Sequence, residues 1–359
     1  MQAQSSLGDL ILHREGVPDT LHGATCPDVY FTSGYGASAA TIDVGTWHCA
    51  ALDDRVLLPY IEREVNEHCS DAASPYGYCG LHVAEDLSER ELASFWQELR
   101  EFWKATGLIT AFLRFSPMDL RSVRMASRLD GLHLTRRGDT ALVPVDQGPD
   151  AAWKAMEGRS RTAIRKAEKS GFSSRLRPVH PDDIASGSTF RRLYEGTMAR
   201  VGSSSKYLFT DEYYQQLLHG LGPALLMAEV CDSDSVIVAA SLVMTHQKRA
   251  HYHLAGSNPD AARLGANNLL VWTIIRWAAA EGMDLVHLGG GLTADDNLFR
   301  FKKSFGGRAA EFWTGTAVLD ENQYRVLAEE RASRAGIPSA RLRHSSFFPL
   351  YRAEFGHGS

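Results

Sequence analysis

The stretch that decides the fold is residues 249–307, which read RAHYHLAGSNPDAARLGANNLLVWTIIRWAAAEGMDLVHLGGGLTADDNLFRFKKSFGG. Residues 249–257 alternate and are rich in aromatic and β-preferring side chains, which predicts a half-buried strand. Residues 258–268 contain proline, glycine and asparagine, which are typical of a turn that enters a helix. Residues 269–281 then place a broad apolar face at helical spacing, and residues 283–288 form a short apolar strand. The stretch therefore predicts a strand, a loop, a helix and a second strand in succession.

The loop before this helix is a candidate anion site. We expect Asn267 or Asn268 to be the N-cap of the helix. The first amides of a helix have no partner within the helix, and the helix dipole favours negative charge there. Together with Arg263 and Gly265, these asparagines are expected to hold a phosphate-bearing ligand. The alternative is that the loop only connects two elements, because most strand–loop–helix units bind nothing.

Glycines and lysines after the second strand extend this site. Three successive residues lack a Cβ, so a ligand can approach their backbone closely: Gly289, Gly290 and Gly291. Further on, Lys302 and Lys303 can add positive charge in a segment that we interpret as a basic loop. Adjacent residues on an extended chain face opposite ways, so the sequence does not decide which lysine points inward. The alternative is that both lysines are solvated.

The composition bounds the class of protein. A chain of 359 residues suggests about two domains. Its 44% hydrophobic and 23% charged residues are ordinary for a soluble globular protein, and its net charge of −5 does not indicate DNA as a partner. Five cysteines without a CxxC pair favour reduced thiols and a cytoplasmic location, and no metal site is expected. No stretch resembles a signal peptide or a membrane span, so we expect no membrane insertion.

The best linker candidate is DQGPD at residues 146–150. It predicts an N-terminal domain over residues 1–146 and a C-terminal domain over residues 151–335. Residues 336–359 are then expected to form a tail that packs on the body of the protein.

The helix predicted for residues 151–170 carries a basic face. Arg161, Arg165 and Lys169 recur every four residues and therefore share one side of the helix. Such a stripe is able to follow a phosphate backbone. The alternative is a solvated helix face, which is the usual meaning of a run of charges.

The order of elements and five motifs together resemble the Fem-type branch of the GNAT superfamily. This branch includes the aminoacyl-tRNA-dependent ligases of peptidoglycan cross-bridges. The second half of the chain reads as helices, a meander of three antiparallel strands and the strand–helix–strand unit, and the first half has a weaker version of this order. The motifs are PYGYCG at residues 75–80, LITAFLRFSP at 108–117, HYHLAGS at 251–257, HLGGG at 287–291 and FRFKKSFGG at 299–307.

The resemblance implies an α+β fold with a mixed sheet, built from two tandem GNAT-like domains (the acyl-CoA N-acyltransferase fold). The first domain would be degenerate and serve the acceptor, and the second would hold the acyl donor. The donor would be aminoacyl-tRNA or acyl-CoA, used as a co-substrate with no permanently bound cofactor. Acyl-CoA users generally show Gln/Arg-x-x-Gly-x-Gly/Ala in the donor loop. Residues 262–267 depart from that pattern, which favours aminoacyl-tRNA.

The resemblance also implies roles for individual residues. Lys302 or Lys303 would stabilise the tetrahedral oxyanion or the 3′ phosphates of the tRNA, and backbone amides around residues 254–257 would polarise the carbonyl. The departing ribose hydroxyl is able to take the proton of the amine itself, and otherwise the candidate bases are Tyr252, His253, His287, Asp295 and Asp296. The acceptor cleft between the domains would be lined by Tyr76 and Tyr78, for which the alternative is a packed structural turn.

We therefore expect a Fem-like transferase that forms an amide by moving an aminoacyl group from aminoacyl-tRNA to an amine. The acceptor would be a small molecule or a cell-wall-type precursor. The first alternative is an N-acyltransferase that uses acyl-CoA, acetyl-CoA included. The second alternative is a non-catalytic GNAT-fold binding protein.

Overall fold

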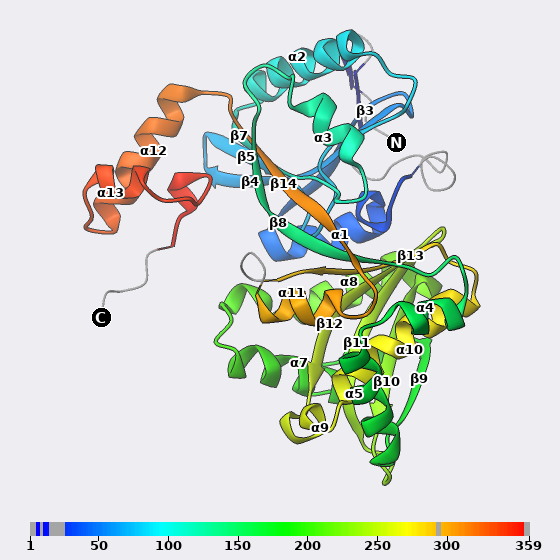
Figure 1. The fold of residues 1–359 in the computed structure, drawn as a ribbon. Helices are drawn as coiled ribbons and strands as arrows, with labels where there is room; N and C mark the ends of the chain where they lie inside the picture. Colours follow the sequence, from blue (N-terminus) through cyan, green and yellow to red (C-terminus); the bar gives the residue numbers. More distant parts are fainter. Residues whose placement is uncertain (1–4, 8–9, 14–25, 292–295, 355–359) are drawn as a thin grey trace. The chain divides into compact units, whose positions relative to one another are not determined.

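The protein, seen in a computed structural model, folds as two compact units (Figure 1). The structure describes residues 5–7, 10–13, 26–291 and 296–354. The first unit contains residues 43–136, together with the described residues before 32 and after 312. The second unit contains residues 32–42 and the described residues of 137–312.

The first unit is built on a sheet with strand order β1, β2, β3, β4, β5, β7 and β14, and β6 pairs with β4. The bounds of β1 to β7 are Ser5–Leu7, Leu10–His13, Gly45–Leu52, Val56–Asn66, Cys69–Ala73, His82–Val83 and Leu108–Arg114. Strand β14 (Arg308–Val318) belongs to this unit from Trp313 onward. Neighbouring strands are antiparallel except β5 and β7, which are parallel. The helices of this unit are α2 (Glu89–Ala105), α3 (Leu120–Ala126), α12 (Glu321–Arg334) and α13 (Ser339–Arg343).

Helix α2, which connects β5 to β7, forms where its sequence predicts it. The Ser88 side chain accepts a hydrogen bond from the Glu91 amide and the Glu91 carboxylate accepts one from the Ser88 amide, which makes a complete capping box. Its apolar face lies in the core of the unit, with five large side chains buried: Leu92, Phe95, Trp96, Leu99 and Trp103. Each of these side chains contributes roughly 1.5–3 kcal/mol by burial, so this face is a main anchor of the first core.

The second unit is built on a sheet with strand order β8, β13, β12, β11, β10 and β9. Their bounds are His133–Pro144, Leu285–Gly290, Arg249–Ser257, Ile237–His246, Leu225–Cys231 and Ser173–Pro178. Strand β8 belongs to this unit from Arg137 onward. Neighbouring strands are antiparallel except β12 and β13, which are parallel.

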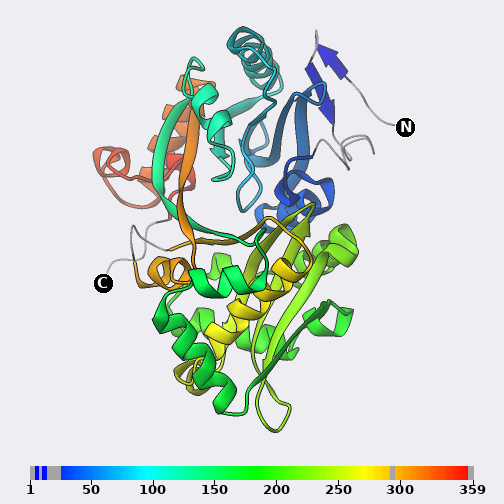
Figure 2. The same ribbon diagram turned by 45° about the vertical axis from the view of Figure 1, so that its right-hand side comes forward.

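Helices cover both faces of the second sheet. Helix α10 (Ala266–Ala280) lies across one face, beside α4 (Pro149–Ala155) and α5 (Gly158–Lys169), as Figure 2 shows. The other face is covered by α7 (Thr189–Arg200) and α8 (Asp211–Leu221). The shorter helices are α6 (Pro181–Ile184), α9 (Pro259–Arg263) and α11 (Asn297–Lys303). None of the helices in the described part of the chain is both long and apolar enough to cross a membrane.

Helix α1 (Ser33–Asp43) joins the second unit although it lies near the start of the chain. Gly34 and Gly220 meet backbone to backbone, and a Cβ built on Gly34 would lie only 2.2 Å from the Gly220 carbonyl oxygen. This contact between α1 and the end of α8 requires glycine on both sides. Tyr35 of α1 is fully buried in the unit.

The two units repeat one order of elements: three antiparallel strands, a helix, and a strand parallel to the third. In each unit, a strand from elsewhere in the chain pairs with the last strand of this repeat. Strand β14 joins β7 in the first unit, and β8 joins β13 in the second. The expected boundaries of 1–146, 151–335 and 336–359 therefore differ from the units of the structure, because long-range strand pairing leaves no local signal in the sequence.

The helix predicted for residues 151–170 is two helices in the structure. Met156 is extended, with ψ 150°, and it separates α4 from α5. The segment interpreted as a basic loop is also different, because residues 297–303 form α11. Asp296 begins this helix by accepting a hydrogen bond from the amide of Phe299 at 2.8 Å.

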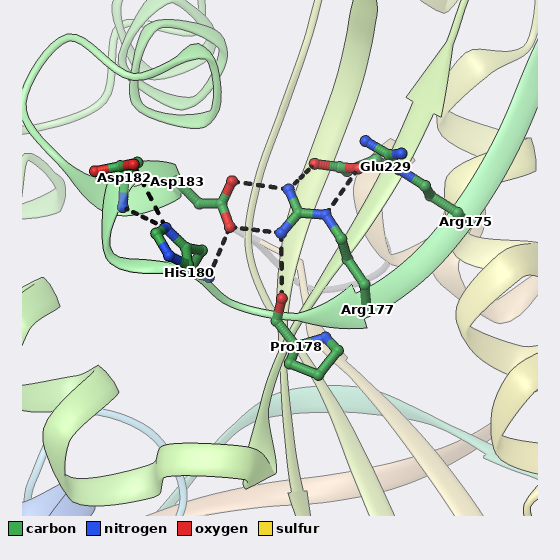
Figure 3. A network of polar contacts seen from close by, with 7 residues as sticks. All are labelled: Arg175, Arg177, Pro178, His180, Asp182, Asp183 and Glu229. Carbon is green, nitrogen blue, oxygen red and sulfur yellow. Dashed lines mark hydrogen bonds and ion pairs between the residues drawn. The ribbon is translucent and has the colours of Figure 1, made fainter.

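An ion-pair network fixes the edge strand β9 to the second sheet (Figure 3). Glu229 of β10 is 2% exposed, and its Oε2 lies 2.6 Å from Arg175 Nε. Arg177 contacts Glu229 as well, and its guanidinium binds Asp183 of α6 at 2.6 and 2.7 Å. A charge buried on a sheet is stable only when it is paired in this way, so the network holds β9 and α6 in place.

Candidate functional site

The parallel strands β12 and β13 separate after three paired residues. The last pair is His251 with His287, whereas β12 continues to Ser257 and β13 continues to Gly290. Beyond this point β12 stays paired with β11 and β13 with β8. No further pairing between β12 and β13 exists among the described residues. The two strands therefore diverge, and within the residues that the structure describes, backbone groups that a continued ladder would pair are not paired with each other across this gap.

The corresponding edge in the first unit is closed. Strands β5 and β7 pair up to Ala73 and Phe112, and a parallel bridge between Cys79 and Phe115 continues the contact. The Ser74 amide also donates to the Phe112 carbonyl at 2.8 Å. Of the two repeats, the second one therefore carries the opened edge.

A β-bulge shapes the opened edge of β12. Ala255 pairs with Ser241 and His253 pairs with Leu242, so Leu254 is an extra residue between them. Leu254 has φ +45°, an uncommon value for a residue with a side chain. Bulges redirect backbone and side-chain groups, and this one lies where amides were expected to polarise a carbonyl.

Lys302 of α11 points back to the end of β13. Its Nζ donates to the Gly290 carbonyl at 2.7 Å and lies 6.0 Å from the centre of the Tyr252 ring. Burial of the ammonium lowers the pKa of Lys302 to about 8, and the charge of Asp296 opposes this effect. Lys303 is exposed on the same helix. Of the two candidate lysines, Lys302 is therefore the one placed against the diverging strands.

The three glycines at the end of β13 and directly after it make room for the protein's own backbone and side chains. Gly289 has φ +74° at a bulge between β13 and β8. A Cβ on Gly290 would lie 3.0 Å from the Asp139 carbonyl oxygen, and one on Gly291 would lie 2.1 Å from the Asp296 carboxylate. These contacts within the protein account for glycine at positions 290 and 291, so a bound ligand is not needed to explain it. Asp295, the other aspartate considered as a base, lies outside the described residues.

The entry to α10 differs from the predicted cap. Gly265, with φ +97°, occupies the N-cap position and no side chain caps the helix, whereas Asn267 and Asn268 lie within the first turn and are half-buried. A Cβ on Gly265 would lie 2.4 Å from the Ala163 carbonyl oxygen of α5. Since no side chain caps this end, the first amides of α10 fit an anion.

The predicted basic face of α5 divides into separate roles. Arg161 donates to backbone carbonyls at the end of α4, including that of Lys154 at 3.3 Å. Arg165 stands over the Trp153 ring, 5.4 Å from its centre, and Lys169 is exposed in the last turn. Lys166 donates to the Arg263 carbonyl at 2.9 Å and ties α5 to the loop before α10. Arg161 therefore supports the fold, while Arg165 and Lys169 present charge at the surface.

Of the candidate bases on the strands, His253 and His287 are buried and Tyr252 is half-buried. His253 is 5% exposed and its Nε2 lies 2.7 Å from the Tyr213 hydroxyl. Burial, together with the charge of nearby His251, lowers the pKa of His253 to about 3, which makes it a weak base. Burial raises the pKa of Tyr252. His287 is 2% exposed, with its Nδ1 3.3 Å from that of His251. With its pKa lowered to about 8, Lys302 is better suited to proton transfer near neutral pH than Tyr252 or His253.

Tyr76 and Tyr78 lie in a packed turn of the first unit. The Arg114 guanidinium stands 5.7 Å from the centre of the Tyr76 ring, and the Tyr78 ring meets that of Tyr30 edge to face at 5.8 Å. Gly77, with φ +116°, is held through its carbonyl by Arg114 Nε at 3.2 Å. Both tyrosines are half-buried within this unit, and their acceptor role stays a prediction.

Sequence reasoning missed the residues that hold the bulge. Tyr213 of α8 and Ser241 of β11 contact His253, and Tyr35 of α1 places its ring edge-on at 6.5 Å. These residues are far apart in the sequence and belong to no motif. The run HYHLAGS marks the strand, but a leucine with positive φ has no sequence signal.

The sequence and the fold of this protein resemble those of known proteins. Residues 154–303 match the family model of the acetyltransferase (GNAT) domain. The comparison with curated proteins gives no match. Among solved structures, FemX is 14% identical with a TM-score of 0.66, covering 88% of this chain and 99% of that chain.

Two further solved structures share the fold over most of their length. L-PGS from Bacillus licheniformis is 14% identical with a TM-score of 0.53, covering 87% of this chain and 93% of that chain. A tandem GNAT protein from the clavulanic acid biosynthesis pathway is 11% identical with a TM-score of 0.51, covering 87% and 99%. The chain therefore has a tandem GNAT fold like that of FemX, and the part that matches the acetyltransferase (GNAT) family model is residues 154–303.

Proposed function

We propose that this protein transfers an aminoacyl group from aminoacyl-tRNA to an amine of a small-molecule or cell-wall-type acceptor and forms an amide. The observation that carries the proposal is the position of Lys302 against the point where β12 and β13 diverge. Its Nζ contacts the end of β13 through Gly290 and the ring of Tyr252 on β12. The fold shared with FemX supports this choice among acyl transfers.

The proposed reaction needs orientation, an oxyanion partner and a path for one proton. The amine nitrogen attacks the ester carbonyl, a carbon–nitrogen bond forms, and the ester carbon–oxygen bond to the ribose breaks. The proton lost by the amine ends on the departing ribose oxygen, which leaves as a free hydroxyl. Backbone amides at the Leu254 bulge would polarise the carbonyl. Lys302 would stabilise the oxyanion as a cation, or carry the proton in its neutral form.

Phosphate groups of the donor would meet the N-terminus of α10. No side chain caps this helix, and Gly265 brings its entry close to α5. Lys169 and Arg165 of α5 are exposed and would add charge for the tRNA. The departure of residues 262–267 from the acyl-CoA loop pattern supports aminoacyl-tRNA as the donor.

An N-acyltransferase that uses acyl-CoA is the second candidate. The uncapped start of α10 supports it equally well, because amides at a helix N-terminus suit a pyrophosphate as well as a tRNA phosphate. In both cases the acyl carbonyl would occupy the opened edge of β12. The two candidates differ in the donor and share the chemistry at Lys302.

The test supplies the purified protein with charged tRNA or with acyl-CoA, in each case with an amine-rich extract and with or without ribonuclease. Product that disappears with ribonuclease supports the tRNA-dependent reaction, and product from acyl-CoA that survives ribonuclease supports the second candidate. Transfer from neither donor would favour a binding protein without catalysis.

Variants at two neighbouring lysines then test which of them takes part in the transfer. Lys302→Met should reduce kcat by about two orders of magnitude or more, because it removes a group that acts in the transition state. Lys303→Met makes the same change at an exposed position and should cost far less. Equal activity of the Lys302→Met variant and the unmodified protein would refute the role of Lys302.

A further inference from the structure

His253 is held from two directions just before the bulge. Its Nε2 lies 2.7 Å from the hydroxyl of Tyr213, a fully buried residue of α8. Its backbone carbonyl accepts a hydrogen bond from Ser241 Oγ at 3.2 Å. Both the side chain and the main chain of this residue are therefore fixed.

The residues after the bulge are also held, from α7. A Cβ on Gly256 would lie 2.3 Å from the Leu193 carbonyl of α7, so the strand touches the helix backbone. The Ser257 amide donates to Thr197 Oγ1 at 3.1 Å, and its carbonyl accepts from the Arg200 guanidinium at 3.2 Å. The strand is thus anchored on both sides of Leu254.

These anchors maintain a strained conformation. A non-glycine residue with positive φ costs roughly 1–3 kcal/mol and persists only where its surroundings enforce it. Without the anchor at His253, Leu254 would relax toward ordinary strand geometry, and the amides that follow it would turn. A displacement of about 1 Å at a reacting group can reduce a rate about 100-fold.

We propose that Tyr213 is a positioning residue that acts through His253 to hold the Leu254 bulge, and with it the carbonyl-binding edge of β12. This inference rests on the acyl transfer proposed above. Tyr213 itself touches no reacting atom. Its hydroxyl restrains the imidazole, the imidazole restrains the strand, and the strand presents the amides.

The neighbouring Tyr214 provides a matched control. It lies on the same helix and is 1% exposed, and its hydroxyl has no hydrogen-bond partner in the described part of the chain. Changing tyrosine to phenylalanine at either position removes one buried hydroxyl from α8. The two variants differ in whether that hydroxyl contacts His253.

The experiment measures steady-state transfer for Tyr213→Phe and Tyr214→Phe, with whichever donor the unmodified protein uses. We expect Tyr213→Phe to lower kcat about 10- to 100-fold with the KM for the donor changed less than threefold, and Tyr214→Phe to leave both unchanged. In a His253→Gln background, the additional effect of Tyr213→Phe should fall below threefold, because the chain of contacts is already altered. If Tyr213→Phe lowers kcat in the His253→Gln background as much as it does in the unmodified protein, the proposal is overturned.

Hydrogen exchange of the peptide covering residues 254–257 gives a reading that does not depend on catalysis. We expect its amides to exchange at least about fivefold faster in Tyr213→Phe and at the unmodified rate in Tyr214→Phe. Equal exchange and equal kcat in Tyr213→Phe and the unmodified protein would overturn the positioning role and leave the proposed function standing. If the unmodified protein transfers from neither donor, the proposed function fails, and unchanged exchange in Tyr213→Phe still refutes the restraint.

Discussion

Replacing Lys302 by methionine should stabilise the protein while lowering its kcat by about two orders of magnitude or more. The pKa of Lys302 is lowered from its ordinary value of 10.5 to about 8 because burial disfavours the ammonium. Each tenfold change in this equilibrium corresponds to about 1.4 kcal/mol, so full burial would cost the folded state about 3 kcal/mol at neutral pH. Lys302 is only partly buried, which reduces that cost through solvent screening. The lost hydrogen bond to Gly290 offsets about 1 kcal/mol more. A net gain of about 1 kcal/mol remains.

The dependence on pH identifies the source of this gain. Below about pH 8 the lysine is charged in both the folded and the unfolded protein, so the folded state bears the whole cost. Between about pH 8 and 10.5 the folded protein has released the proton and the unfolded chain still holds it. The stability of the unmodified protein therefore rises with pH over this window, and the advantage of Lys302→Met shrinks.

Urea denaturation at pH 7 and pH 9.5 measures both effects, with Lys303→Met as the exposed control. We expect a higher midpoint for Lys302→Met at pH 7, a smaller difference at pH 9.5, and no change for Lys303→Met at either pH. A lower midpoint for Lys302→Met at pH 7 would show that the ammonium stabilises the fold, and the reasoning from burial would be refuted.

Three other substitutions test the framework of the two units. Asp71→Asn should destabilise the first unit by about 3 kcal/mol or more, because the fully buried Asp71 carboxylate binds Arg63 at 2.7 Å and Arg352 at 2.6 Å, and thermal denaturation measures the loss. Gly265→Ala should cost about 1–3 kcal/mol from its positive φ alone and weaken donor binding, measured as an increase in the KM for the donor. Gly34→Ala should loosen α1 from the second unit by about 1–3 kcal/mol, which limited proteolysis of residues 32–42 would detect.

The sequence predicts elements whose signals are local. The capping box at Ser88 and the apolar spacing of α2 are confirmed by the structure. The strand at residues 249–257, the helix after it and the short strand that ends in glycines are also found. In each case, side chains within one turn or one strand determine the outcome, so spacing is sufficient evidence.

The features that the sequence does not predict depend on distant contacts. Gly265 replaces the expected asparagine cap because α5 packs too closely for a Cβ at that position. Residues 297–303 form a helix because Asp296 caps them, and this places adjacent lysines about 100° apart, so they do not face opposite ways. Strand β8 pairs with β13, and β14 pairs with β7, although more than a hundred residues of sequence separate the two strands of each pair. Such pairings are decided by the assembled core.

Costly local features of the second unit gather where β12 and β13 diverge. Leu254 holds a positive φ, Lys302 is partly buried with a lowered pKa, and β12 leaves its parallel partner after His251. The first unit has the same order of elements, yet its parallel strands stay joined to the Cys79–Phe115 bridge. Stability alone would close the second edge as well, because pairing satisfies backbone groups and relieves strain. A chain that keeps these costs together at one of two equivalent positions is expected to use that position for function. On these grounds the candidate functional site lies in the second unit, at the point where β12 and β13 diverge.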